Sequence, residues 1–312
     1  MELMLEAPGK INLTLDVLRR RDDGYHDVEI ILQSIDVVDR LIISKLPSGI
    51  ILETDCPDIP TDAANLAYRA AQALLAGQPA GVKIVLEKSI PVAAGLAGGS
   101  TDAAAALIGT NDLLALGLSS LEMKRLAVKL GADVPFCLQG GTVLATGIGE
   151  HLQILPPPPD FWLVLVKPPF GVSTADAYCR LQSGRLSNRP EIRGMIDGIK
   201  KKDLNLMIAF MGNVLEPVVA SLHPEITSIK ADLVAAGALG AQMSGSGPTV
   251  FGVFADQGPA HQAGKELRNL YLGKPSCSGY RVIVTKNRQE GITVRRGKNG
   301  TAAADTREIG QL

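Results

Sequence analysis

The sequence has almost no excess of charge of either sign, and this limits its partners. Its 31 Lys and Arg residues nearly balance its 32 Asp and Glu residues, which gives a formal net charge of −1. Proteins that bind nucleic acid or an anionic membrane through phosphate groups normally carry a surplus of positive charge. We therefore expect neither nucleic acid nor a membrane as a partner.

Long apolar runs are also missing. The longest, such as residues 161–166, are far shorter than the roughly 20 residues that a helix needs to cross a bilayer. The first six residues, Met-Glu-Leu-Met-Leu-Glu, include acids and lack the basic segment that opens a secretion signal. We expect a cytoplasmic protein.

Cysteine is scarce, and its spacing argues against both disulfides and a structural metal. The chain has no C-x-x-C pair, and its histidines show no metal-ligand spacing with one another or with cysteine. The cysteines are Cys56, Cys137, Cys179 and Cys277, and the histidines are His26, His151, His223 and His261. We expect free thiols that are buried or partly buried, no structural zinc, and no residues dedicated to binding a metal.

The composition that remains is that of a globular protein with one large or two ordinary domains. Of the 312 residues, 46% are hydrophobic and 20% are charged. Four consecutive prolines, Pro156–Pro159, form a stiff extended connector and predict a domain boundary. We place the first domain at 1–155 and the second at 160–286, and we predict a mobile tail at 287–312, which is polar and Gly-rich.

Local patterns predict strands and helices in both halves. Residues 2–18 indicate two short strands that flank a Pro8-Gly9 turn, and 28–38 and 40–44 indicate two more strands. Thr61 is the expected N-cap of a helix that ends near residue 76. Pro135 favours an extended residue before it, so Asp133 is expected at a corner between a helix and a strand.

A glycine-rich loop at 91–101 is the strongest local signal. Gly95, Gly98 and Gly99 permit close approach of the backbone, and Ser100 or Thr101 is a suitable N-cap for the alanine-rich helix that follows. Free N–H groups and the positive end of a helix dipole would make this loop an anion site, typically for a nucleotide phosphate. The spacing fits neither the Walker A pattern nor the dinucleotide fingerprint. The alternative is an ordinary turn before a core helix.

Several polar residues outside the loop have both a functional and a structural interpretation. Lys10, in an apolar strand, is either a surface side chain or a fixed cation. Tyr25 and His26 end a charged loop. This loop is either a solvated hairpin tip or a stacking face for a nucleobase. Asp133 either caps local N–H groups or serves a reaction.

Three segments occur together in a characteristic order: residues 7–12 (Ala-Pro-Gly-Lys-Ile-Asn), the glycine loop at 91–102, and a Gly/Ser loop at 243–254. In order and spacing they resemble the three motifs of the GHMP kinases, and the resemblance covers about residues 5–285. The variant Ala97-Gly-Gly-Ser100, with Asp23-Gly-Tyr-His-Asp27, resembles one branch of that family, whose acceptor carries a cytidine diphosphate.

The resemblance implies a two-domain α+β GHMP kinase fold with the active site in the cleft between the domains. The implied activity is ATP-dependent phosphorylation of the 2-hydroxyl of 4-diphosphocytidyl-2-C-methyl-D-erythritol, in non-mevalonate isoprenoid biosynthesis. The small-molecule cytidine diphosphate substrate and ATP are the implied partners, and Mg²⁺ accompanies ATP as co-substrate. We expect no tightly bound cofactor, and a monomer or weak homodimer.

The resemblance also implies roles for individual residues. Asp133 matches the catalytic aspartate that takes the proton of the acceptor hydroxyl, and Lys10 matches the lysine that orients that site. The implied ATP contacts are Asn65, Pro91, Ala93, Ala94, Gly95, Leu96, Ala97, Gly98, Gly99, Ser100, Thr101 and Asn111. The implied substrate contacts are Asn12, Tyr25, His26, Tyr178, Gly245 and Ser246. No carboxylate is assigned to Mg²⁺, for which Ser100 or Thr101 is a candidate ligand.

Other functions remain as alternatives. A homoserine or mevalonate type of GHMP kinase is the nearest, and the Asp-Gly-Tyr-His segment argues against it. A non-catalytic nucleotide-binding regulator is the second, and the joint presence of Lys10, Asn12 and Asp133 argues against that. A structural or RNA-binding role is weakened by the balanced charge.

Overall fold

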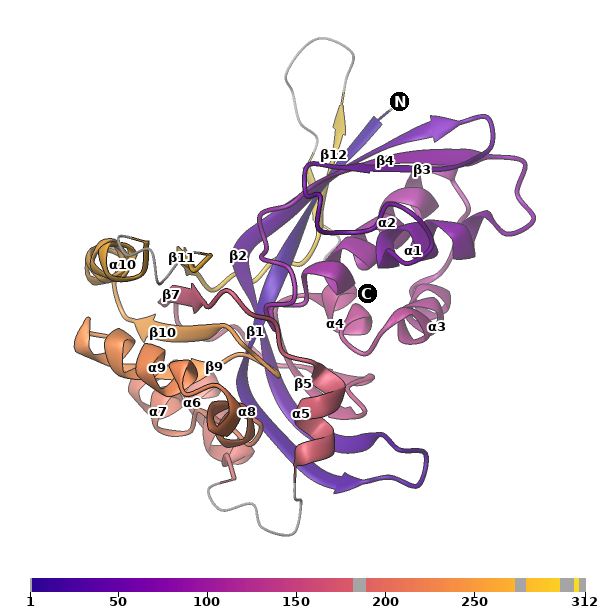
Figure 1. Ribbon diagram of the computed structural model, residues 1–312. Helices are drawn as coiled ribbons and strands as arrows, with labels where there is room; N and C mark the ends of the chain where they lie inside the picture. Colours follow the sequence, from indigo (N-terminus) through magenta and orange to yellow (C-terminus); the bar gives the residue numbers. More distant parts are fainter. Residues whose placement is uncertain (1, 182–188, 273–278, 298–305, 309–312) are drawn as a thin grey trace.

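Two β-sheets organise the chain in the computed structural model, which describes residues 2–181, 189–272, 279–297 and 306–308 (Figure 1). The larger sheet has the path β13-β12-β1-β2-β4-β3, with β5, β6 and β8 attached beside it. The smaller has the order β11-β7-β10-β9. Cys277 and the end of the chain after 308 lie outside the described residues. Within the described residues, no helix is both long and apolar enough to cross a membrane.

Two long antiparallel strands, β1 (Glu2–Arg20) and β2 (His26–Leu46), form the backbone of the larger sheet. The prediction of two short strands around a Pro8-Gly9 turn is wrong, because the chain runs through this point with only a shift in register. Proline cannot donate to a strand ladder, so it is tolerated where pairing is interrupted. Beside this irregularity the N–H of Lys10 leaves the ladder and donates to the carbonyl of Leu96, at 3.1 Å.

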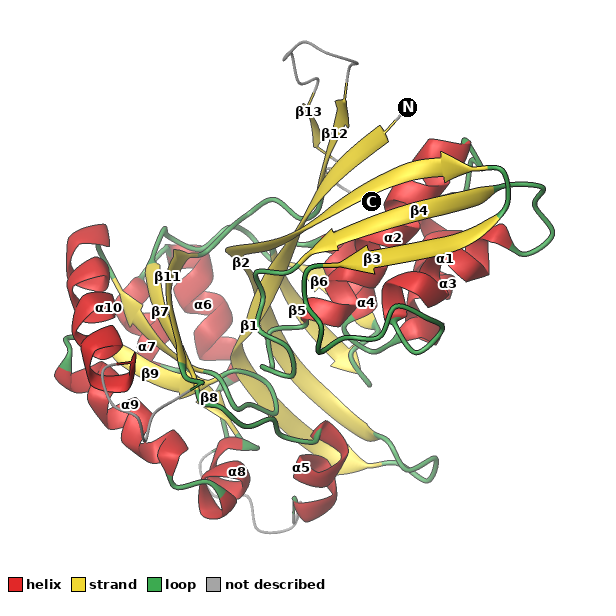
Figure 2. Cartoon of the chain, turned by 45° about the horizontal axis from the view of Figure 1, so that its top comes forward, coloured by secondary structure: helices red, strands yellow, loops and turns green. Residues whose placement is uncertain are grey.

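The remaining strands of the larger sheet are β3 (Gly49–Thr54), β4 (Gly81–Glu87), β5 (Thr142–Gly147) and β6 (His151–Ile154). Four helices gather on one side of it: α1 (Leu66–Leu75), α2 (Gly98–Leu114), α3 (Ser120–Leu130) and α4 (Val134–Gln139) (Figure 2). Helix α1 begins later than expected, because Asn65 rather than Thr61 is its N-cap.

Helix α2 is buried around nearly its whole circumference. Its alanines allow close approach to the sheet, and Gly109 allows the closest: a Cβ there would lie 2.5 Å from Ile43 Cδ1 and 2.9 Å from Leu5 Cδ1. Small side chains on α2 therefore fix the distance between the sheet and the helix that follows the glycine loop.

The smaller sheet contains β7 (Trp162–Lys167), β9 (Gly240–Met243), β10 (Val250–Phe254) and β11 (Arg281–Lys286), all antiparallel to their neighbours. Side chains of β7 alternate between its faces. Leu163 and Leu165 join a cluster with α6 (Ile192–Lys201) and α7 (Leu204–Ala209). Val164 and Val166 join the cluster that includes α9 (Glu225–Ala235) and α10 (Gln257–Leu272).

Three short elements connect this sheet with the larger one. Strand β8 (Gly212–Asn213) pairs parallel with β1 at Thr14 and Leu15, and α8 (Glu216–Leu222) follows it. Helix α5 (Thr174–Arg180) lies beside the long hairpin in Figure 1.

The segment after residue 286 returns to the larger sheet. Strand β12 (Thr293–Gly297) pairs antiparallel with Glu2–Glu6, and β13 (Thr306–Glu308) pairs with β12. The prediction of a mobile tail is therefore wrong for 293–297, which Figure 1 shows in yellow beside the N-terminal end. The polar composition concealed Ile292 and Val294, which are buried in the core. We propose that the first domain consists of 1–155 together with this returning segment.

Candidate active site

A cavity of about 720 Å³ opens between the two sheets and contains most of the residues that the sequence analysis singled out. The predicted site residues that line it are Lys10, Asn12, Tyr25, His26, Asn65, Pro91, Ala93, Ala94, Gly95, Ala97, Gly98, Gly99, Asp133, Tyr178, Gly245 and Ser246. Leu96, Ser100, Thr101 and Asn111 are not among its lining residues.

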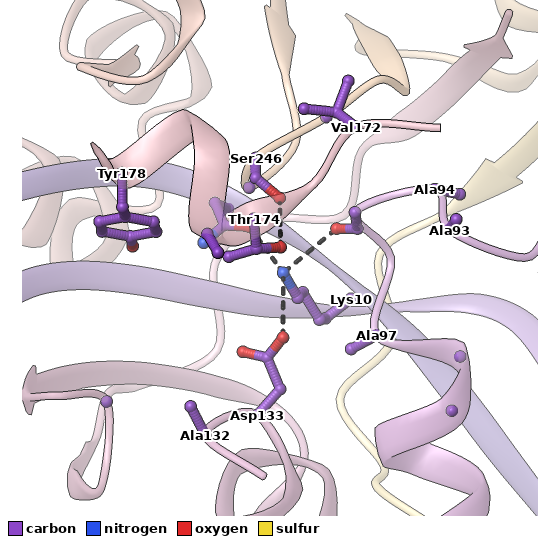
Figure 3. Close-up of a pocket in the computed structure, with 18 of the residues that line it drawn as sticks. Lys10, Ala93, Ala94, Ala97, Ala132, Asp133, Val172, Thr174, Tyr178 and Ser246 are labelled. Carbon is purple, nitrogen blue, oxygen red and sulfur yellow. Dashed lines mark hydrogen bonds and ion pairs between the residues drawn. The ribbon is translucent and has the colours of Figure 1, made fainter. Parts of the chain in front are cut away.

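Lys10 lies at the centre of the cavity as a fixed cation. Its Nζ donates to Asn12 Oδ1 at 2.9 Å and to the Gly95 carbonyl at 3.1 Å, and it lies 3.7 Å from Asp133 Oδ2. The side chain is only 4% exposed, so it does not extend into solvent as a surface lysine would. Figure 3 shows it pointing at the carboxylate of Asp133.

Asp133 lies in a corner between two helices, not between a helix and a strand as expected. Helix α3 ends at Leu130, and α4 begins at Val134 with Pro135 in its first turn. Proline is tolerated there because the first N–H groups of a helix have no intrahelical acceptor. Asp133 is the N-cap residue, yet its side chain makes no capping hydrogen bond. With 41% exposure, its carboxylate faces Lys10 and the cavity.

The glycine loop brings a helix N-terminus to the cavity. The backbone is left-handed at Ala93, Gly95 and Ala97, with φ of 50°, 74° and 59°. Only glycine fits at 95, because a Cβ would lie 2.3 Å from the carbonyl oxygen of Ser244. The predicted N-cap at Ser100 or Thr101 is wrong: Ala97 is the N-cap and α2 begins at Gly98.

This earlier start favours an anion site. The first N–H groups of an α-helix have no intrahelical acceptor, and the helix dipole adds positive potential at that end. Gly98 and Gly99 both line the cavity, so their backbone is accessible to a ligand. The arrangement suits a phosphate group.

A buried charged cluster lies beneath this loop. The ammonium of Lys88 contacts Asp39 Oδ2 and lies 2.7 Å from Asp102 Oδ2, and the three side chains are at most 7% exposed. Asp39 Oδ1 also accepts the N–H of Ser89 and of Ile90. Asp102 Oδ1 is buried without a hydrogen-bond partner among the described residues.

The ammonium of Lys88 is thus paired with two carboxyl groups, and burial and charge within this cluster shift the pKa of both Asp102 and Lys88. Burial raises the pKa of Asp102 to about 8, against the opposing charge of Lys88 and with the added repulsion of Asp39. Burial alone would lower the pKa of Lys88, but the charges of Asp102 and Asp39 outweigh it and raise that pKa. Burial thus favours the protonated form of Asp102, and the ammonium of Lys88 opposes it.

The tip of the long hairpin and α5 form an aromatic end of the cavity. Tyr25 is 60% exposed at the tip, as a hairpin position predicts. The rings of His26 and Tyr178 lie 5.2 Å apart at 41°. Burial, with the charge of Arg20, lowers the pKa of His26, and burial, with the charge of Asp133, raises the pKa of Tyr178. Both rings are therefore uncharged at neutral pH and able to contact a base.

The loop after β9 closes the cavity opposite Asp133. Ser244 Oγ donates to the Gly95 carbonyl at 3.0 Å, the same carbonyl that accepts from Lys10. A Cβ at Gly245 would lie 3.3 Å from both Lys10 Nζ and Asn12 Oδ1. The hydroxyls of Ser246 and Thr174 lie 2.8 Å apart and connect this loop with α5 (Figure 3).

The two asparagines expected to contact ATP, Asn65 and Asn111, make structural hydrogen bonds. Asn65 caps α1, with Oδ1 accepting the N–H of Ala67 and Nδ2 donating to the Pro60 carbonyl, although it also lines the cavity. Asn111 Oδ1 accepts the N–H of Leu118. It lies 13 residues along α2 from Gly98, or about 20 Å, so the structure does not bring it to the site.

Sequence reasoning missed Lys88, Asp102 and Thr174, all of which line the cavity. A detectable signal existed for one of them, because Asp102 is a carboxylate directly after the glycine loop and immediately before the apolar run 103–108. Lys88 and Thr174 carried no comparable signal, since their partners are distant in sequence.

The arrangement is suited to phosphoryl transfer. It combines a carboxylate that can accept a proton, a fixed ammonium 3.7 Å away, and a helix N-terminus that can hold phosphate. That reaction requires positioning and electrostatic stabilisation more than covalent help from the protein.

Comparison with known proteins agrees with this geometry. Residues 65–141 match the family model of the GHMP kinases N terminal domain, and 195–272 match that of the GHMP kinases C terminal domain. A 4-diphosphocytidyl-2-C-methyl-D-erythritol kinase of Brevibacillus brevis is 45% identical over 273 residues, which cover 86% of this chain and 94% of that protein. The chain belongs to the GHMP kinase family.

Further GHMP kinases are similar to this chain over most of its length. A 4-diphosphocytidyl-2-C-methyl-D-erythritol kinase of Pelotomaculum thermopropionicum is 51% identical over 265 residues, which cover 84% of this chain and 92% of that protein. A crystal structure of 4-(cytidine 5'-diphospho)-2C-methyl-D-erythritol kinase matches with a TM-score of 0.75 and 34% identity, covering 92% of this chain and 99% of that one. A homoserine kinase from Cytophaga hutchinsonii matches with a TM-score of 0.73 at 23% identity, covering 94% and 97%, and shows the shared fold alone.

These findings confirm the expected two-domain GHMP kinase fold and an enzyme rather than a non-catalytic regulator. The protein is a kinase that uses ATP as co-substrate and a small-molecule acceptor.

Proposed function

We propose that this protein transfers the γ-phosphoryl group of ATP to the 2-hydroxyl of 4-diphosphocytidyl-2-C-methyl-D-erythritol, in non-mevalonate isoprenoid biosynthesis. The single observation that carries this proposal is one cavity with the Lys10–Asp133 pair at its centre and the rings of Tyr25, His26 and Tyr178 at its end. The names of the relatives at 45% and 51% identity support the same substrate.

In the proposed reaction the acceptor hydroxyl lies between Asp133 and the γ-phosphorus. The hydroxyl oxygen forms a bond to phosphorus while the bond between phosphorus and the departing ADP oxygen breaks, and Asp133 takes the hydroxyl proton. Lys10, held by Asn12 and by the Gly95 carbonyl, keeps its charge beside the reacting oxygens. Its fixed position stabilises the negative charge that spreads over the phosphoryl oxygens.

The first turn of α2 is the proposed phosphate site. The N–H groups near Gly98 and Gly99 are available there to the phosphate oxygens. Mg²⁺ bound with ATP would neutralise negative charge on the phosphates. In this turn Ser100 is partly exposed but does not line the cavity, Thr101 is fully buried, and Asp102 is already engaged with Lys88. We therefore propose that phosphates and water supply most of the ligands of Mg²⁺.

The aromatic end of the cavity is the proposed cytidine site. Tyr25 offers an exposed ring face for stacking, and His26 and Tyr178 offer uncharged rings with polar atoms. The hairpin is held in shape by the Arg21 N–H to the Tyr25 carbonyl, at 2.8 Å, and by the Tyr25 N–H to Asp23 Oδ1, at 3.0 Å. A homoserine or mevalonate acceptor has no base that would use these rings. A cytoplasmic location and a monomeric or weakly dimeric state remain predictions.

The test is a coupled assay of ADP release with Mg-ATP and separate acceptors. The acceptors are 4-diphosphocytidyl-2-C-methyl-D-erythritol, homoserine, mevalonate and galactose. We expect turnover with the cytidine compound alone. Faster turnover with another acceptor would contradict the substrate, and turnover with none, despite ATP binding, would contradict the role of Asp133.

A further inference from the structure

The loop that closes the cavity, Ser244–Gly247, is held from behind by the turn between β8 and α8. Asn213, at the end of β8, is buried, and its amide makes three hydrogen bonds. Its Nδ2 donates to the Met243 carbonyl at 2.9 Å and to the Gly245 carbonyl at 2.8 Å, and its Oδ1 accepts the N–H of Leu215 at 2.9 Å.

These contacts fix the orientation of the amide. Turning it by 180° would place its oxygen against two carbonyl oxygens and its NH₂ against an N–H donor. Each hydrogen of Nδ2 therefore has a defined acceptor, on either side of Ser244. No other natural side chain of this size offers two donors and one acceptor in the same arrangement.

Glu216 in the same turn adds a third bond to the loop. Its Oε2 accepts the N–H of Met243 at 2.8 Å, and Lys230 pairs with its other oxygen. The turn thus binds both the N–H and the carbonyl of Met243 and the carbonyl of Gly245. The main chain entering the loop has little freedom to shift.

The loop leads directly to Lys10. Ser244, between the two carbonyls that Asn213 binds, donates to the Gly95 carbonyl, and Lys10 Nζ donates to that carbonyl as well. Gly245 lies so close to Lys10 Nζ and Asn12 Oδ1 that a Cβ would be 3.3 Å from each. A shift of the loop would therefore move the acceptor of the lysine and one wall of its pocket.

We propose that Asn213 is a positioning residue for phosphoryl transfer, which holds Ser244–Gly247 in register with Lys10 and the glycine loop. The inference rests on the proposed function for its substrate. Asn213 is not among the residues that line the cavity, so it acts through the loop and not on a ligand. Its loss should lower kcat and leave binding at the aromatic end unchanged.

The experiment compares a graded series of substitutions. Asn213→Ser keeps one donor, and Asn213→Asp keeps the acceptor for Leu215 but has no donor for either carbonyl. We expect kcat to fall in the order Asn, Ser, Asp, by about 10- to 100-fold at the end of the series, because a misplacement of about 1 Å at a reacting centre costs that much. KM for the cytidine substrate and the Kd of cytidine diphosphate, measured by calorimetry, should stay within about twofold.

A second readout does not depend on turnover. The N–H of Ser244 bonds to the Thr249 carbonyl, and the N–H of Gly247 bonds to the Ser244 carbonyl. In Asn213→Asp these amides should exchange with deuterium at least about tenfold faster than in the wild type. Lys230→Gln is the matched control, since it removes an ion pair of the same turn and keeps every hydrogen bond to the loop.

The outcomes distinguish a failure of the proposed function from a failure of the inference about Asn213. If the wild type does not use the cytidine compound, the proposed function fails, and deuterium exchange still decides the role of Asn213. The inference is overturned by kcat within twofold of the wild type in Asn213→Ser and Asn213→Asp, or by an equal loss of kcat in Lys230→Gln. If Asn213→Asp does not fold, Asn213→Ser alone decides: an unchanged kcat and unchanged exchange overturn the inference.

Discussion

Replacing Asp102 by asparagine should make the stability of the protein less dependent on pH. The wild-type carboxyl group is buried beside Lys88 and Asp39, and its pKa is raised from 3.8 to about 8. Asparagine has nearly the same shape, keeps one oxygen to accept from Lys88, and resembles the protonated acid. It has no proton to release.

The direction in which stability changes with pH depends on whether the folded or the unfolded state holds the Asp102 proton. Between pH 4 and 8 the folded protein keeps the Asp102 proton and the unfolded chain has lost it. The wild type therefore loses stability as pH rises through this window, by up to about 1.4 kcal/mol per pH unit, and the loss levels off above pH 8. Asp102→Asn lacks this contribution. As pH increases from 4 to 8, the free energy of unfolding of the variant should therefore rise relative to that of the wild type, by up to about 1.4 kcal/mol per pH unit.

The assay is urea unfolding of both proteins at pH 5.5, 6.5, 7.5 and 8.5, or thermal unfolding, where the difference corresponds to about 2 °C per pH unit. The comparison of the two proteins cancels titrating groups that do not interact with Asp102, and leaves the contribution of Asp102 with its neighbours Lys88 and Asp39. Asp58→Asn, at an exposed carboxylate, is the control and should show no such trend. A constant difference between wild type and Asp102→Asn across this range would mean that Asp102 is ionised at neutral pH, which refutes the reasoning.

Three further predictions concern the site. Asp133→Asn should fold normally and bind ATP while kcat falls about 10²- to 10⁴-fold, the usual contribution of a positioned base; a kcat near that of the wild type would remove this role. Tyr25→Ala should raise KM for the cytidine substrate about 5- to 150-fold at constant KM for ATP, because stacking contributes about 1–3 kcal/mol; an unchanged KM would place the base elsewhere. Gly95→Ala should lose both stability and activity, whereas Gly117→Ala, also at positive φ but with open space around it, should lose only a little stability; equal losses would contradict the steric argument.

The sequence was most informative where the signal was local, in the glycine loop. Residue type and spacing left the roles of Lys10 and Asp133 open, and the resemblance to the GHMP kinases implied them; the structure brings the loop and both residues to one cavity. The expected N-cap of α2 was three or four residues too late, because a left-handed backbone at Ala97, an unusual conformation for alanine, is not visible in a sequence.

Most of the features that the sequence did not predict depend on contacts between residues that are distant in sequence. Lys88 pairs with Asp39 and Asp102, which are 49 and 14 residues away, and no pattern connects them. Asn213 meets a loop 30 to 32 residues later. Strand β12 forms because β1 offers it an edge to pair with, and its own composition is that of a loop. In each case tertiary structure decides what local preference leaves open.

Asn287 has a mechanical consequence. Two of the connections between the sheets, the proline segment before β7 and the segment after β11, are joined by this side chain: its Oδ1 accepts the N–H of Phe161, and its Nδ2 donates to the Pro159 carbonyl. The two connections are therefore held against each other, and neither can be displaced without breaking a hydrogen bond of Asn287 or moving the other connection with it.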